Sequence, residues 1–156
     1  MVARSSAVRQ AADDELFIER VFDAPRRLVF KAWTSAEYQM HWLGPKDFTV
    51  EFCEIDFRVG GKYRARIRSP EGQDYTMYGV YREIVAPERL VFTFAWEEEG
   101  ERGLETLVTI DFIEQGDKTL MSFHQVPFQS LAERDGHNGG WTQCFDRLAA
   151  YLVATA

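Results

Sequence analysis

The residues best suited to metal or acid–base chemistry in this chain are its three histidines and two cysteines. His41, His124 and His137 are far apart, and none has a partner at the HxH, HxxH or HExxH spacing typical of metal sites. Cys53 and Cys144 lie in separate apolar segments, which favours buried thiols over a disulfide framework or a CxxC metal site. The sequence therefore predicts neither a bound metal nor a cofactor.

Catalytic motifs give no positive signal either. The chain lacks the Gly-x-Ser-x-Gly, phosphate-loop and Gly-x-Gly-x-x-Gly patterns. Its glycine doublets at 60–61 and 139–140 are explained by a tight turn and by close approach of a helix. The carboxylates gather at residues 97–101, in a predicted solvated hairpin loop, and no paired acids are recognisable. If the protein is an enzyme, its catalytic side chains must lie inside a cavity of the fold, where these sequence motifs do not identify them.

Length and charge indicate a single domain that does not act on nucleic acid. With 156 residues the chain can bury one sizeable core, so we expect one domain over residues 15–156 after a flexible tail over residues 1–14. The formal net charge of −7 disfavours nucleic acid and anionic membranes as partners. Neither a signal peptide nor a membrane-spanning run is recognisable, so we expect a cytoplasmic protein, either a monomer or a homodimer.

The positions of turn residues predict a strand, two short helices, a series of strands and a long final helix. Residues 16–22 form the first strand, and an acidic residue before Pro25 begins a helix over residues 25–33. Thr34 or Ser35 caps a second short helix, which ends at Gly44. Short turns then separate strands in an antiparallel meander over residues 48–57, 62–68, 75–85, 90–96, 104–113 and 119–126.

Alternating residues within these strands indicate a sheet with one apolar and one polar face. In residues 62–68, the side chains of Tyr63, Ala65 and Ile67 point one way, and three arginines point the other. Residues 75–85 and 119–126 carry bulky side chains on both faces, so the pattern there does not separate the faces. The arginines either form a basic ribbon or pair with acidic residues on neighbouring strands, and the acidic composition favours pairing.

The end of the chain predicts a helix laid across this sheet. Ser130 and Glu133 have the spacing of a capping box, so the helix begins near Leu131, although glycines at 136, 139 and 140 leave open a later start at Asn138. One side of the helix is apolar and wide enough to pack on a sheet. It carries Trp141, Cys144, Phe145, Leu148, Tyr151 and Leu152.

This order of elements resembles the helix-grip fold of the START and birch-pollen-allergen superfamily, SRPBCC. Over about residues 15–152, local motifs are similar to its branch related to the C-terminal domain of the activator of heat-shock-protein-90 ATPase. The motifs are Asp23-Ala24-Pro25, Trp42-Leu43-Gly44-Pro45, Gly60-Gly61-Lys62-Tyr63, His137-Asn138-Gly139-Gly140-Trp141 and Asp146-Arg147-Leu148. The resemblance implies an α+β fold, in which a curved antiparallel sheet of about seven strands wraps around the C-terminal helix.

The resemblance also implies a cavity between sheet and helix that holds a small apolar ligand, lipid-like or aromatic. We expect its wall to include Trp42, Tyr63, Met77, Phe94, Trp96, His124, His137, Trp141 and Phe145. Tyr63, His124 or His137 would offer the ligand a polar contact. Aromatic residues alone would equally fill a solid core. Two alternatives stay open: a co-chaperone-like module that binds a protein partner, and a cyclase- or hydrolase-like enzyme that works inside the cavity.

Overall fold

A computed structural model describes residues 13–98, 101–102 and 104–155, so most of the predicted tail lies outside the described residues. The architecture is the predicted α+β helix-grip fold. The elements are β1 (Leu16–Phe22), α2 (Arg26–Thr34), α3 (Ala36–Gln39), β2 (Thr49–Ile55), β3 (Lys62–Arg68), β4 (Asp74–Val85), β5 (Arg89–Glu98), β6 (Glu101–Arg102), β7 (Thr106–Gln115), β8 (Lys118–Val126) and α4 (Leu131–Thr155). None of the described helices is long and apolar enough to span a membrane.

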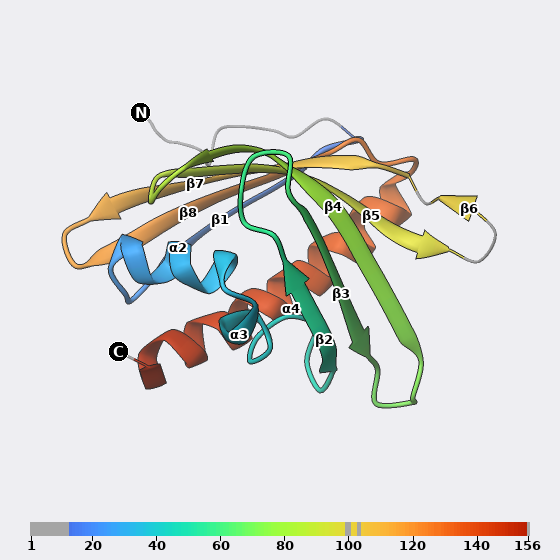
Figure 1. The fold of residues 1–156 in the computed structure, drawn as a ribbon, viewed down its shortest axis with the longest axis horizontal. Coiled ribbons are helices and arrows are strands. Elements are labelled where there is room, and N and C mark those ends of the chain that lie inside the picture. The colour runs from blue at the N-terminus through green and yellow to red at the C-terminus, as the bar shows by residue number, and fades with distance from the viewer. Residues whose placement is uncertain (1–12, 99–100, 103, 156) are drawn as a thin grey trace.

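The sheet is antiparallel throughout, with strand order β1-β8-β7-β5-β4-β3-β2. The predicted meander is confirmed from β2 to β8, and β1 adds to its end by pairing with β8. The two-residue strand β6 pairs with β5 in the segment predicted to be a loop. Figure 1 shows the curved sheet arching over α4, with α2 and α3 beside the C-terminal half of that helix.

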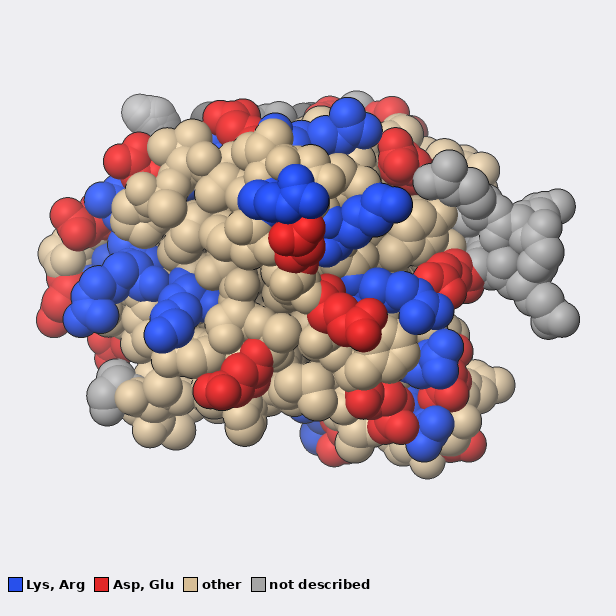
Figure 2. All heavy atoms as spheres, in the orientation of Figure 1, with Lys and Arg blue, Asp and Glu red and all other residues tan. Residues whose placement is uncertain are grey.

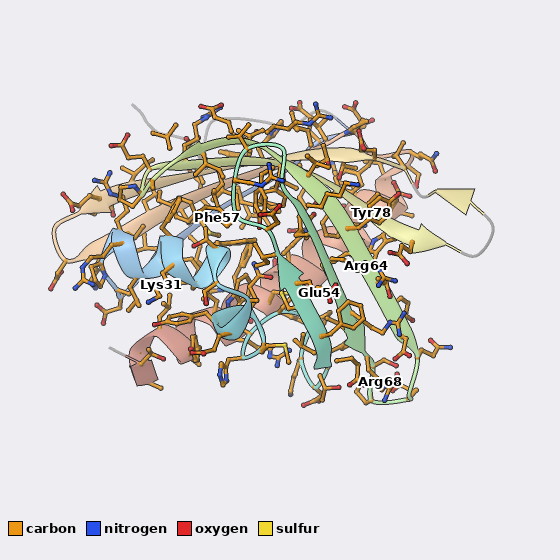
Figure 3. The ribbon with its side chains drawn as sticks, viewed as in Figure 1. Lys31, Glu54, Phe57, Arg64, Arg68 and Tyr78 are labelled. Atoms are coloured by element: carbon orange, nitrogen blue, oxygen red, sulfur yellow. The ribbon has the colours of Figure 1, made fainter. Side chains whose placement is uncertain are left out.

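The outward face of the sheet carries the three predicted arginines of β3, and two of them are paired with carboxylates. Arg64 of β3 binds Glu97 of β5, and Arg68 lies 2.7 Å from Asp74 of β4 and 3.0 Å from Glu51 of β2. Figure 2 shows Lys and Arg interspersed with Asp and Glu over β2, β3 and β4, and Figure 3 labels Arg64 and Arg68 along β3. The prediction of cross-strand pairing is therefore confirmed for these two arginines.

The caps of α3 and α4 follow the predicted polar side chains, whereas α2 begins after Pro25 without the predicted side-chain cap. Ser35 is the cap of α3, because its hydroxyl accepts from the backbone N–H of Tyr38 at 3.3 Å. At the start of α4, the Ser130 hydroxyl accepts from the N–H of Glu133 at 3.1 Å, and the Glu133 carboxylate accepts from the N–H of Gln129. The helix continues through all three glycines, so the alternative start at Asn138 is wrong.

Replacing Gly139 by alanine should stabilise the protein. A Cβ there would have no neighbour within 4 Å, so the change removes only the backbone entropy cost of glycine in a helix. We expect the free energy of unfolding to rise by about 1 kcal/mol, and the melting temperature by about 2–4 °C in calorimetry. Gly79→Ala is the contrasting control, because its Cβ would overlap the carbonyl oxygen of Thr93. A melting temperature lowered by Gly139→Ala would contradict this explanation.

Candidate functional site

A cavity of about 520 Å³ lies between the N-terminal half of α4 and one end of the sheet. The sheet contributes Ile67, Tyr75, Met77, Phe94 and Trp96 from β3, β4 and β5. The helix contributes Gly136, His137, Gly140, Trp141 and Cys144. The loop after α3 closes a third side with Leu43, Gly44, Pro45 and Phe48. Among the described wall residues, only Asp74 and Glu97 are acidic, and the interior is mainly apolar.

The structure brings together most of the residues predicted for the cavity. The wall includes Met77, Phe94, Trp96, His137 and Trp141. Tyr63 lines a second, smaller cavity that lies deeper in the fold and shares part of the same wall. The hydroxyl of Tyr63 donates to the carbonyl oxygen of Thr93 at 2.7 Å, so its proton is already engaged.

Trp42, Phe145 and His124 do not line the cavity. Trp42 and Phe145 are fully buried in the core, where the Trp42 indole donates to the carbonyl of Ala32. Buried and partly exposed residues alternate along β8, and His124 is one of the partly exposed ones. Its Nε2 lies 2.6 Å from a carboxylate oxygen of Glu15. Because side chains alternate along a strand, His124 lies on the sheet face away from α4 and cannot contact a ligand in the cavity.

Two glycines of α4 were missed as wall residues. Gly136 and Gly140 are one helical turn apart on the side of α4 that faces the cavity. A side chain at Gly136 would extend into open space, and one at Gly140 would reach Pro45. The signal was present in the sequence, since each glycine weakens the helix by about 1 kcal/mol relative to alanine. In exchange for this loss of helix stability, the missing side chains leave space beside the helix, and this space is part of the cavity.

A buried hydrogen-bond chain joins α4 to three neighbouring strands. The indole N–H of Trp141 donates to Gln125 Oε1 on β8, and Gln125 Nε2 donates to Thr106 Oγ1 on β7, each at 2.9 Å. The hydroxyl of Thr106 then donates to the carbonyl of Phe94 on β5. Gln125 is fully buried, and an unpaired amide there would be costly, so both of its ends have partners. This chain of hydrogen bonds fixes Trp141 in the cavity wall.

Arg147 of α4 holds the loop wall in place. Its Nη1 lies 3.3, 2.9 and 3.1 Å from the carbonyl oxygens of Leu43, Gly44 and Pro45. Gln143, one helical turn earlier, accepts from the backbone N–H of Lys46 at 2.9 Å. The guanidinium group thus bonds to carbonyls of a loop that belongs to no helix or strand. These bonds tie the loop to α4 along one side of the cavity.

His137 is the histidine that reaches the cavity. The indole N–H of Trp96 donates to His137 Nε2 at 3.2 Å, which requires the imidazole to be unprotonated at that nitrogen. Burial among Phe94, Trp96 and Phe128 lowers the pKa of His137 below its ordinary value of 6.5, and nearby Glu133 opposes this only in part. The ring is therefore neutral at physiological pH, and its Nδ1 carries the proton.

The remaining wall chemistry is unreactive at neutral pH. Burial raises the pKa of the Cys144 thiol to about 12, so it is protonated and behaves as an apolar group. At the mouth, the hydrogen bond from Arg64 lowers the pKa of Glu97, and the hydrogen bond from Arg68 lowers the pKa of Asp74. Among the described residues, no group of three or more His, Cys, Asp or Glu side chains is arranged to hold a metal ion.

Known proteins resemble the chain along nearly its whole length. Residues 23–153 match the family described as Activator of Hsp90 ATPase homolog 1-like protein. A crystal structure from Chromobacterium violaceum is 27% identical, with a TM-score of 0.82 over 90% of this chain and 98% of that one. The AHSA1 protein from Silicibacter pomeroyi is 24% identical, with a TM-score of 0.80 over 91% and 99% of the two chains. A search of curated proteins found no match.

Removing the guanidinium of Arg147 should loosen the loop wall. Arg147→Met keeps the apolar stem of the side chain but removes the donor from the carbonyls of Leu43 and Gly44 and leaves that of Pro45 with the N–H of Phe48 alone, so we expect urea denaturation to show a loss of about 2 kcal/mol. Arg20→Met is the matched control. It removes the exposed ion pair of Arg20 (β1) with Asp146 of α4 and the contact of its guanidinium with the Phe22 ring, and it should cost less than about 1 kcal/mol. Equal losses in the two variants would contradict the clamp.

Stability should depend on the protonation of His137. Because its pKa is lowered in the folded state, the unfolded chain binds more protons below pH 6.5, and the free energy of unfolding should fall as the pH drops through that value. His137→Gln keeps an acceptor for Trp96 but does not titrate. Urea denaturation at several pH values should show a steeper acid loss in the wild type than in His137→Gln. Identical pH profiles would count against a buried neutral imidazole.

Proposed function

The chain belongs to the Activator of Hsp90 ATPase homolog 1-like family, and from that premise we propose that it binds a small apolar molecule in the cavity beneath α4. The observation that carries the proposal is the cavity itself, whose volume of about 520 Å³ falls within the range of small-molecule sites. Its wall is formed by aromatic and aliphatic side chains from sheet, helix and loop. Removal of a ligand and of this wall from water would drive binding.

Several features support a space that stays open in the free protein. Glycines occupy the helix positions that face it, and Arg147 and Gln143 tie the loop wall to α4. At the mouth, Tyr75 keeps 42% of its surface exposed. Apolar surface left in contact with water is unfavourable, so an apolar ligand would improve the energetics of this region.

The two alternatives have less support. A protein partner would need an available outer face, but two of the three arginines of β3, Arg64 and Arg68, are already paired with neighbouring carboxylates. An enzyme would need a general acid or base in the cavity. The carboxylates at the mouth, Asp74 and Glu97, are held as arginine-bound anions, and His137 has its Nε2 engaged by Trp96.

Filling the cavity from the helix should weaken binding. Gly136→Leu introduces a side chain into open space at the cavity wall, and we expect the Kd for the neutral fluorescent probe N-phenyl-1-naphthylamine to rise about tenfold or more. The measurement is a fluorescence titration of each purified protein at fixed salt and pH.

Gly139→Leu is the matched control, because it makes the same substitution in the same helix at an exposed position that does not line the cavity. The control should bind the probe like the wild type. Absence of probe binding by the wild type, or equal loss in both leucine variants, would overturn the proposed site.

A further inference from the structure

Of the four tryptophan indole nitrogens, three donate a hydrogen bond and one has no partner among the described residues. Trp42 donates to the carbonyl of Ala32, Trp96 to His137 and Trp141 to Gln125. Trp33 is only 3% exposed, and its Nε1 has no hydrogen-bond partner among the described residues. Buried N–H groups without partners are rare in folded proteins because they lose water and gain nothing in return.

Trp33 forms part of the wall of the smaller, inner cavity, which has a free volume of about 20 Å³. That space is sufficient for one atom of about the size of a water oxygen. The inner and main cavities share four wall residues, Leu43, Met77, Phe94 and Trp141. The inner cavity therefore lies directly behind the wall of the main one, on the side towards Trp33.

Two other polar side chains of the inner cavity, Tyr63 and Gln39, are already engaged in hydrogen bonds. The Tyr63 hydroxyl donates to the carbonyl of Thr93. Gln39 donates through Nε2 to the carbonyl of Trp33 at 2.6 Å and accepts from the Cys53 thiol through Oε1. The Trp33 N–H is buried in the same wall and has no acceptor among the described residues.

Met77 is the most adaptable part of the shared wall. Its side chain is unbranched and has several rotatable bonds, so it can change rotamer at low cost, whereas Phe94 and Trp141 are held by aromatic neighbours. A ligand in the main cavity can reach the inner one if the Met77 side chain turns aside.

We propose that the inner cavity receives one uncharged acceptor atom of the apolar ligand, such as a ketone, ester or ether oxygen, which accepts a hydrogen bond from Trp33 Nε1. This inference rests on the proposed function and specifies its ligand class. The charges near the site exclude an anionic end group: neither Lys nor Arg is found among the described residues that line the two cavities, and Asp74 and Glu97 lie at the mouth. A carboxylate would be desolvated there without a counter-ion.

Two naphthalenes of matched shape test the inference. 2-Acetylnaphthalene carries a carbonyl acceptor, and 2-isopropylnaphthalene replaces it with a methyl group. For the wild type, we expect the Kd of the isopropyl compound to be about five times the Kd of the acetyl compound. A ratio of this size corresponds to one added neutral hydrogen bond. Trp33→Phe removes the donor and should bring this ratio close to one. Trp42→Phe, another buried indole that lines neither cavity, should leave the ratio unchanged.

Nuclear magnetic resonance of the unmodified, ¹⁵N-tryptophan-labelled protein gives a second measurement that does not depend on a folded variant. The Trp33 indole signal, assigned through its contacts with Trp42 and Phe92, should shift when the acetyl compound binds and stay in place with the isopropyl compound. If both compounds bind equally and the Trp33 signal does not move, the acceptor site is wrong while the proposed function stands. If neither compound binds, both are overturned.

Discussion

The hydrogen bond from the Trp141 indole to the buried amide of Gln125 sets the distance between the terminal helix and the sheet. Gln125 lies fully buried on β8 and is itself held by Thr106 on β7, which is bonded to the backbone of β5. A buried amide tolerates little displacement, because each lost partner leaves a desolvated polar group. The helix is therefore fixed at one point against three adjacent strands.

The two halves of α4 have different surroundings because of this fixed point. Towards the C-terminus, Phe145, Leu148 and Leu152 are fully buried and pack in the common core with Trp33 and Trp42. Towards the N-terminus the helix carries glycines where it faces the sheet, and β3, β4 and β5 present Ile67, Met77 and Trp96 across the space that results. The C-terminal half of α4 thus closes the core, and its N-terminal half forms one wall of the cavity.

Much of the fold could be predicted from sequence because its signals are local. The alternation in Lys62–Arg68 and the capping side chain of Ser130 gave element bounds and faces correctly. His124 was misplaced because β8 has bulky residues on both faces, and local alternation then does not say which face meets the helix. Trp42 and Phe145 were assigned to a cavity wall but fill the core, since residue type does not distinguish a wall from packing. The pairing of Trp141 with Gln125 depends on tertiary geometry alone.

The pairing of β1 with β8 has a consequence for how the chain reaches this structure. Leu16 lies opposite Gln125, and Phe22 opposite Thr119, so the first strand finds its place only on the last one. Contacts so distant in sequence form slowly, because a long loop must close before any pairing rewards it. On the ribosome, the meander from β2 onward can assemble as it emerges, whereas β1 must wait until β8 is made. Until then, the unpaired backbone of β1 is an exposed strand edge.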